Sequence, residues 1–416
     1  MARHLITSAL PYINGVKHLG NLVGSMLPAD VYARFLRAGG HEVLAICATD
    51  EHGTPAELGA LEEGVDVAEY CARHHETQRE LGQRFGLSWD WFGRTSRPQN
   101  QELTSHFARR LRDEGYTDIR TTAQVYSVAD ERFLPDRYVE GTCPNCGYDR
   151  ARGDQCENCG KQLEPTDLIE PRSALSGSTR IEVRDSAHVF LLQSKLADRI
   201  RAWVDTKEDW PQLTRSIAYK WLDEGLEDRG ITRDLAWGVP VDPDDFPEAA
   251  GKVWYVWFDA PIGYLSISQQ FWESKGQPER FEEFWKSDDT ELYHFIGKDN
   301  ITFHAVVFPS ILWGSQRGWI VPTNVPANEF FNLEGRKFNT SEGWFIPEGA
   351  LEGRVPVDAL RFALCSMMPE TADSEWTWSE LQSRVNDDLA DNLGNFVSRT
   401  LRFICLLYTS PSPRDS

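Results

Sequence analysis

The chain has 416 residues, enough for about two or three domains, and 41% of them are apolar, including fifteen tryptophans. This composition indicates a globular protein. No run reaches the roughly eighteen apolar residues that a membrane span requires, so no membrane partner is expected. The net charge of −21 excludes a uniformly basic surface for nucleic acid, but not a local basic patch. A strand pattern begins by Leu5 and leaves no room for a signal peptide, so a cytoplasmic protein is expected.

Residues 1–115 alternate between strand and helix patterns, as in the first half of a doubly wound parallel sheet. The run from Pro11 to Gly15 is typical of a turn, so His18 and Gly20 lie where a helix begins after the carboxyl end of a strand. In chain order, the patterns predict strand 3–10, helix 18–38, strand 42–47, a helix from about 54 to 72 and helix 99–115.

Residues 116–225 interrupt this rhythm with a Cys-rich, Gly-rich and strand-like insertion. Each of its two Cys-x-x-Cys pairs forms a turn that aims two thiolates at one point, and nine residues separate the pairs. Four thiolates fill the tetrahedral shell of Zn²⁺ and leave no open position, so we predict one structural zinc and not a catalytic one. The alternative is four buried cysteines without a metal. The predicted zinc knuckle spans about 141–162, with ligands Cys143, Cys146, Cys156 and Cys159.

Residues 226–330 return to the alternating pattern and form the second half of the sheet. Apolar strands are predicted near 253–258, 292–296 and 319–321, with a helix from Phe303 to Gly314. The predicted fold class is therefore α/β: a Rossmann-like doubly wound parallel sheet that the zinc-knuckle insertion splits. Residues 331–385 form a small mixed segment, and apolar residues at helical spacing over 386–404 indicate the start of a helical bundle.

The last twelve residues, 405–416, do not continue the helical pattern. Leu-Leu-Tyr-Thr-Ser-Pro-Ser-Pro-Arg-Asp-Ser is similar to a translated sequencing adapter, so we expect an artefactual tail on a chain that is shorter than its natural gene product. The alternative is a genuine disordered C-terminus.

The run His18-Leu19-Gly20-Asn21 has the chemistry of a phosphate site. Free N–H groups and the helix dipole favour an anion at a helix start, and a flat ring could lie on the backbone at Gly20 because it has no side chain. Asp50 ends the second strand, where a carboxylate can bind an ammonium group; the alternative role is a helix cap, for which Thr54 competes.

Two later blocks add a pocket wall and nucleotide contacts. Trp257, Ala260, Pro261 and Tyr264 would enclose a flexible unbranched side chain, and sulfur packs well against aromatic rings. In the other block, Gly297 permits the close approach of a nucleotide, Lys298 can reach a phosphate and Asp299 can accept from ribose hydroxyls. For any single aromatic residue, core packing is the alternative.

These blocks are collinear and together resemble the methionyl-tRNA synthetase family of class I. His18 to Asn21 resembles the HIGH signature, and Lys337-Phe338-Asn339-Thr340-Ser341 resembles the KMSKS loop. The runs Asp50-Glu51-His52-Gly53, Tyr255 to Tyr264 and His294 to Asp299 also match this family, which covers the chain from Arg3 to about Phe403. Thr340 departs from the pattern because it replaces the second lysine of KMSKS, which removes one cation from the pyrophosphate site.

The resemblance implies a role for each matched residue. Catalytic contacts fall on His18, Asn21, Lys298 and Lys337. The methionine pocket comprises Ala9, Leu10, Tyr12, Asp50, Trp257, Ala260, Pro261, Tyr264 and His304. ATP is bound by His18, Gly20, Asn21, Gly297, Lys298, Asp299, Lys337 and Thr340.

The implied activity is that of a methionine–tRNA ligase, with ATP, methionine and tRNA(Met) as partners and Mg²⁺ on the phosphates. Residues 331–385 would hold the KMSKS-like loop and contact the tRNA stem, and 386–404 would begin a truncated anticodon-binding domain. A leucyl-type enzyme would need a larger editing insertion, and a cysteinyl enzyme would place its zinc in the amino-acid pocket. An inactive synthetase-like RNA-binding protein is the alternative from another class.

Overall fold

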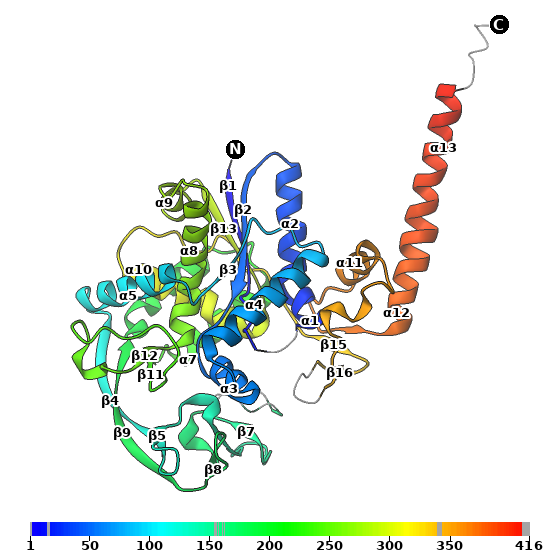
Figure 1. The fold of residues 1–416 in the computed structure, drawn as a ribbon. Coiled ribbons are helices and arrows are strands. Elements are labelled where there is room, and N and C mark those ends of the chain that lie inside the picture. Colours follow the sequence, from blue (N-terminus) through cyan, green and yellow to red (C-terminus); the bar gives the residue numbers. More distant parts are fainter. Residues whose placement is uncertain are drawn as a thin grey trace, which may run out of the picture.

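The core of the molecule is a five-stranded sheet built from segments on both sides of the insertion (Figure 1). The computed structural model describes residues 2–14, 17–153, 156, 158–159, 161, 163–338 and 343–409. The strand order is β14-β13-β1-β2-β3, and every neighbouring pair is parallel, which confirms the doubly wound parallel sheet. The strands are β1 (Arg3–Ser8), β2 (Glu42–Thr49), β3 (Trp91–Arg94), β13 (Thr290–Gly297) and β14 (Ala327–Asn328).

Both faces of this sheet are buried under helices. Neighbouring residues along a strand point to opposite faces, so each face contributes its own set of apolar side chains. Ile6 and Ala45 face one way and pack with Ala33 of helix α2 (Leu27–Ala38). Leu5 and Leu44 face the other way and join the largest core cluster, which contains helices α5 (Pro98–Asp113) and α8 (Val256–Ser274). The sheet is therefore the middle of three layers, and its strand ends remain free to carry a site.

The predicted helices 18–38 and 99–115 are present. The first comprises α1 (Leu19–Asn21), the π-helical segment η1 (Leu22–Met26) and α2, and the second is α5. The single helix predicted over 54–72 is wrong, because two helices lie there, α3 (Thr54–Glu63) and α4 (Val67–Arg84). Gly64 ends α3 in the left-handed conformation (φ 66°), and the Asp66 side chain caps α4. Strand β3 was not predicted.

The insertion is strand-rich at its start, as predicted, but it ends in two helices. Its long antiparallel ribbon pairs β4 with β9 along eleven residues each. Sheets β10-β9-β4-β5 and β7-β6-β8 lie below the main body in Figure 1. The elements are β4 (Thr117–Ser127), β5 (Arg132–Phe133), η2 (Asp136–Tyr138), β6 (Val139–Thr142), β7 (Ala151–Arg152), η3 (Pro165–Asp167), β8 (Ile169–Ser173), β9 (Ile181–Leu191), η4 (Gln193–Leu196), α6 (Ala197–Asp205), α7 (Gln212–Glu224) and β10 (Arg229–Gly230).

Two of the three strands predicted in the second half are wrong. Within 253–258 only β12 (Val253–Trp254) is a strand; it pairs antiparallel with β11 (Thr232–Arg233), and α8 begins at Val256. No strand covers 319–321, and the outer strand is β14 instead. Strand β13 and the helix predicted from Phe303 to Gly314 are confirmed, the latter as η7 (Phe303–Val307) and α10 (Phe308–Gly314). The connecting elements are η5 (Pro247–Ala249), α9 (Arg280–Trp285) and η6 (Lys298–Asn300).

The C-terminal part contains a small sheet of order β16-β15-β17 and a projecting helix (Figure 1). That helix runs through the π-helical segment η9 (Arg384–Gly394) into α13 (Asn395–Thr409), so it continues five residues beyond the predicted boundary at 404. Phe396 and Leu401 on it are 66% and 56% exposed. The remaining elements are β15 (Phe331–Leu333), β16 (Arg336–Lys337), η8 (Glu348–Leu351), α11 (Val357–Ser366), β17 (Ser374–Trp376) and α12 (Trp378–Ser383).

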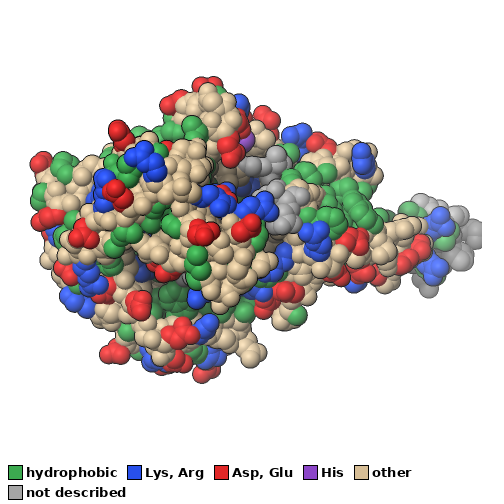
Figure 2. Space-filling view, turned by 90° about the horizontal axis from the view of Figure 1, so that it is seen from below, with side chains coloured by type: hydrophobic (Ala, Val, Ile, Leu, Met, Phe, Trp, Pro, Cys, Tyr) green, Lys and Arg blue, Asp and Glu red, His purple; other side chains and the backbone are tan. Residues whose placement is uncertain are grey.

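Acidic and basic side chains are interspersed on the face seen in Figure 2. The net negative charge is therefore not gathered into one acidic field on that face. Among the described helices, none has the length and apolar character needed to cross a bilayer.

Candidate active site

A cavity of about 1210 Å³ opens at the carboxyl edge of the sheet, around the adjacent strands β1 and β13. The chain reverses its strand order at this pair, and such a switch point is where open α/β sheets bind ligands. Of the residues predicted to bind methionine or ATP, all that fall within the described part of the chain line this cavity, whereas Thr340 lies outside the described residues. They are Ala9, Leu10, Tyr12, His18, Gly20, Asn21, Asp50, Trp257, Ala260, Pro261, Tyr264, Gly297, Lys298, Asp299, His304 and Lys337.

His18 caps the N-terminus of α1 through its ring. Its Nδ1 accepts from the backbone N–H of Gly20 at 3.1 Å, and the Asn21 Oδ1 accepts from the His18 N–H at 3.1 Å. A Cβ atom at Gly20 would lie 2.9 Å from the His18 ring, so only glycine leaves room for this turn. His18, Gly20 and Asn21 thus fix the conformation of this turn through their mutual hydrogen bonds.

The His18 imidazole is neutral at physiological pH. Burial is the larger cause and the nearby Lys17 cation the smaller, and together they lower the pKa of His18 to about 4. Because Nδ1 accepts a hydrogen bond, the single ring proton of the neutral form is on Nε2. His18 can therefore donate from Nε2 to an oxygen in the cavity.

Asp50 follows β2 and is 5% exposed. Its backbone is fixed by Pro11 O, which accepts from Asp50 N at 2.9 Å, and by Ile13 N, which donates to Asp50 O at 2.8 Å. Among the described residues, no group bonds to the buried Oδ1 atom of Asp50. Burial, followed by the Asp259 and Glu51 charges, raises the pKa of Asp50. A cationic ligand group would satisfy this oxygen and stabilise the ionised carboxylate.

One face of α8 forms an apolar wall of the cavity. Trp257, Ala260, Pro261 and Tyr264 recur at helical spacing and therefore share that face. The Trp257 ring stacks on Phe303 at 3.7 Å between centroids and meets Tyr12 edge-on at 6.2 Å. This wall offers aromatic surface without a charged group, as an unbranched thioether side chain requires.

His304 closes the same wall with a defined tautomer. Its Nδ1–H donates to the Asn300 carbonyl at 2.8 Å, so the bare Nε2 accepts from the Tyr264 hydroxyl at 2.8 Å. Burial lowers the pKa of His304 to about 4. The pair is therefore neutral and adds no charge to the pocket.

Two lysines converge on the opposite side. Lys298, in η6 directly after β13, pairs with Glu329 at 2.5 Å and with Asp373 at 3.1 Å. The ammonium groups of Lys298 and Lys337 lie 3.7 and 4.3 Å from the centre of the Phe330 ring. Burial raises the pKa of Asp299, and these two cations oppose that rise. A Cβ atom on Gly297 would meet open space, so the cavity reaches the backbone there.

Several residues that line the cavity were not predicted. Arg233 donates from Nε to both Asp136 oxygens at 3.3 Å and lies 3.7 Å from the centre of the Tyr255 ring. Arg229 lies 5.2 Å from the centre of Phe303. The spacing of two arginines four residues apart was the only sequence pattern that could have indicated them. Asp136 belongs to the insertion, which therefore contributes to the cavity.

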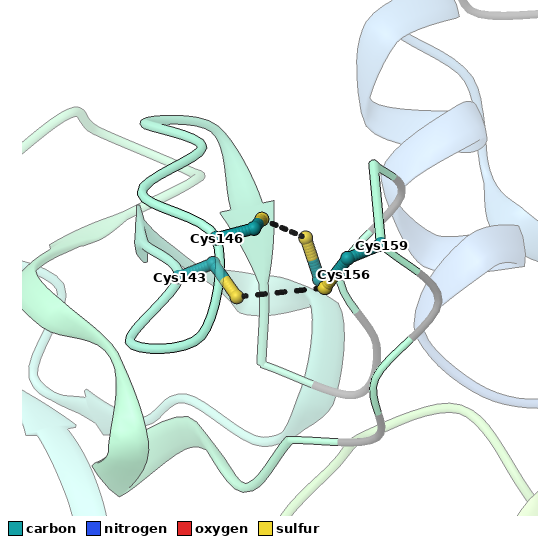
Figure 3. A group of neighbouring side chains, drawn as sticks. All are labelled: Cys143, Cys146, Cys156 and Cys159. Carbon is teal, nitrogen blue, oxygen red and sulfur yellow. Dashed lines mark hydrogen bonds between the residues drawn. The ribbon is translucent and has the colours of Figure 1, made fainter.

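The four cysteines of the insertion come together as predicted (Figure 3). Their sulfur atoms all lie within 4.8 Å of one another, with Cys143 and Cys159 at 3.9 Å and Cys146 and Cys156 at 3.6 Å. A tetrahedron of thiolates around Zn²⁺ with bonds of about 2.3 Å has edges of about 3.8 Å. The donor set and its dimensions therefore fit a metal.

Residues 4–401 match the family model described as tRNA synthetases class I (M). The chain therefore belongs to the class I tRNA synthetases. A methionine--tRNA ligase of Caulobacter vibrioides is 58% identical over 97% of this chain and 72% of its own length, and that of Roseobacter denitrificans is 55% identical over 99% and 74%. Within its class, the chain is thus an enzyme of the methionine--tRNA ligase type, not of the leucyl or cysteinyl type.

Solved structures agree with this assignment. The methionyl-tRNA synthetase of Mycobacterium tuberculosis in complex with methionyl-adenylate has a TM-score of 0.75 and 26% identity, over 97% of this chain and 72% of that one. The Rossmann-like class I fold expected from the sequence is confirmed.

Proposed function

We propose that the cavity at the β1–β13 edge activates methionine with ATP and then transfers it to tRNA(Met). The observation that carries this proposal is the convergence of a buried carboxylate with one unsatisfied oxygen, an aromatic wall and two cations around one helix start. These are the three sets of contacts that methionyl-adenylate formation needs. An enzyme of this kind works mainly by positioning and charge stabilisation.

Methionine binds along the α8 wall. Its ammonium group pairs with the free Oδ1 of Asp50, and its thioether packs between Trp257 and the Tyr264–His304 pair. Ala9, Leu10 and Tyr12, from the loop after β1, close the pocket, and Ala260 and Pro261 leave room for an unbranched chain. This arrangement directs the carboxylate of methionine towards His18.

ATP binds against α1 and the loop after β13. Asp299 accepts from the ribose hydroxyls, the bare backbone at Gly297 admits the nucleoside, and Asn21 holds the turn beside Gly20. His18 donates from Nε2 to a phosphoryl oxygen, while Lys298 and Lys337 neutralise the β- and γ-phosphates. Thr340 occupies the sequence position of the second lysine of the KMSKS pattern, so it can offer ATP a hydroxyl group but no charge. Mg²⁺ supplies further charge neutralisation when it is bound with ATP.

The first step is an in-line displacement. A carboxylate oxygen of methionine attacks the α-phosphorus, the bond from that phosphorus to the bridging oxygen breaks, and pyrophosphate leaves with the electron pair. Negative charge grows on the phosphate oxygens near His18 and the lysines, where fixed donors lower the barrier. In the second step the 2′-hydroxyl of the terminal adenosine attacks the carbonyl, and AMP leaves.

The cysteine cluster has a separate, structural role in this proposal. Cys143, Cys146, Cys156 and Cys159 hold one Zn²⁺, which shapes the part of the insertion next to Asp136 and the cavity. Four protein ligands leave no position for substrate.

Methionine-dependent exchange of pyrophosphate into ATP tests the proposal. His18→Ala should slow exchange about 10²-fold while the KM for methionine stays within roughly twofold, because His18 contacts developing charge and not the amino acid. Charging of tRNA(Met) tests the second step. If purified chain catalyses neither reaction yet binds RNA, the alternative of an inactive RNA-binding protein is correct.

A further inference from the structure

The His18 imidazole lies against a ring from the second signature segment. Phe338, directly after β16, stacks on it with 4.8 Å between centroids and 11° between planes. On its other side, Phe338 is nearly parallel to the buried Phe331 of β15, at 6.0 Å and 12°. His18 is therefore stacked on two rings of one segment more than three hundred residues later, and Phe331 anchors that segment in a hydrophobic core.

The same ring also bounds the space above Gly20. A Cβ atom at Gly20 would lie 3.4 Å from Phe338 and 2.9 Å from His18. The Gly20 N–H fixes the in-plane direction of the imidazole by donating to Nδ1, and Phe338 covers one face of the ring. Together they leave the imidazole one orientation, in which Nε2 is the donor of the ring.

Backbone contacts between residues 346–347 and the start of α1 hold the two signature segments together beside the His18–Phe338 stack. Leu19 N donates to Ile346 O at 3.1 Å, and His18 forms an isolated bridge with Pro347. Phe345 also approaches His18, but at 6.2 Å and tilted by 52°, so it does not stack. Of the two aromatic neighbours, Phe338 alone can set the plane of the imidazole.

We propose that Phe338 is a positioning residue for the reaction: it holds the His18 ring in the plane from which Nε2 donates to ATP, and it excludes water from that ring face. The inference rests on the proposed role of His18. It gives the second position of the KMSKS-like segment a defined physical task. The first position, Lys337, carries charge, and Phe338 orders the histidine that donates beside it.

The environment of His18 gives this role a measurable signature. Burial is the main cause of the lowered pKa of His18, and Phe338 covers one of its faces. The neighbouring cations do not offset this lowering of the pKa of His18. Lys17 lowers it further, and the ammonium group of Lys337 lies over the Phe330 ring. Removing the Phe338 ring should therefore move the pKa of His18 from about 4 towards its ordinary value of 6.5.

The first experiment follows the His18 ring by NMR between pH 5 and 8 in wild type, Phe338→Ala and Phe338→Tyr. Wild type and Phe338→Tyr should not titrate in this range, whereas in Phe338→Ala the titration of His18 should move up into it. Phe345→Leu removes the tilted neighbour and serves as the matched control; it should behave as wild type. Titration that is unchanged in Phe338→Ala would overturn the proposal, provided that the thermal unfolding curve shows the variant to be folded.

The second experiment is a double-mutant cycle in pyrophosphate exchange. Phe338→Ala should lower kcat about tenfold with the KM for methionine within roughly twofold, and Phe338→Tyr should restore kcat. The same substitution should cost less than about twofold in a His18→Ala background, because the group that it positions is already gone. An equal loss in both backgrounds would refute the positioning role. A His18→Ala variant with full activity would instead refute the proposed role of His18, and the NMR experiment would still test the stack.

Discussion

Substitution of Gly20 by alanine tests the fit of the phosphate-binding turn most directly. The new Cβ would lie 2.9 Å from Cε1 and Nδ1 of His18, closer than the 3.4 Å at which ordinary contacts begin. The imidazole must shift by a few tenths of an ångström, which weakens its bond to Gly20 N and tilts it against Phe338. A misplacement of 1 Å can cost about 10²-fold in rate, so we expect a loss of roughly tenfold or somewhat more.

The loss should appear mainly in catalysis, with at most a small cost in stability from the displaced His18 ring. Gly20 has no positive φ, so alanine is not strained there, and within a helix it removes some conformational entropy from the unfolded chain. Gly24→Ala, one turn later, is the matched control because a Cβ atom there meets nothing within 4 Å. Gly24→Ala should melt at or above the wild-type temperature, Gly20→Ala should stay folded but melt no higher than wild type, and only Gly20→Ala should lose kcat/KM in methionine-dependent pyrophosphate exchange. Wild-type exchange by Gly20→Ala would show that the His18 geometry is not what limits the rate.

Three further outcomes are expected. Asp50→Asn should raise the KM for methionine by roughly tenfold or more, since a hydrogen bond to a charged group is worth about 1.5–3 kcal/mol, and an unchanged KM would remove Asp50 from the pocket. In wild type, methionine affinity should fall as the pH drops through the raised pKa of Asp50, because the protonated carboxyl no longer pairs with an ammonium group, and Asp50→Asn should lack this pH dependence in isothermal titration. Removal of metal by a chelator under reducing conditions should increase hydrogen exchange over residues 141–162 and leave β1 and β13 protected. Comparable cysteine sites in small peptides bind Zn²⁺ with an apparent free energy of about 10–16 kcal/mol, so the metal should survive purification. Freshly purified chain without zinc would contradict the assignment of the cluster.

The predicted methionine and ATP residues line one cavity, whereas several of the elements that carry them were predicted wrongly. The residues of the α8 wall were selected for their chemistry, yet the first turn of α8, with Trp257, was assigned to a strand because 253–258 is continuously apolar. A short apolar run does not distinguish a buried strand from a buried helix. The spacing of Trp257, Ala260, Pro261 and Tyr264 at i, i+3, i+4 and i+7 already favoured a helix, despite the proline inside it.

Other misses came from local and tertiary effects. The break between α3 and α4 depends on the left-handed conformation of Gly64 and the cap of Asp66, both visible in the sequence as breaking residues within an apolar pattern. Strand β14 is only two residues long and is set by its pairing with β13, which no local pattern reveals. The contribution of Asp136 and Arg233 to the cavity likewise requires the folded insertion, because their pairing joins residues 97 positions apart.

The pairing of β1 with β13 also governs when this enzyme becomes competent during synthesis. Arg3 lies opposite Thr290, so β1, which precedes the other four strands of the sheet in the chain, can pair with β13 only after the whole insertion has emerged from the ribosome. Until then β1 has one unpaired edge, a surface on which chains associate wrongly. Closing so long a loop costs entropy before the contact repays it, which makes long-range parallel pairing slow. The cavity lies at this same edge, so a chain in which β1 and β13 have not yet paired has no site at which to act.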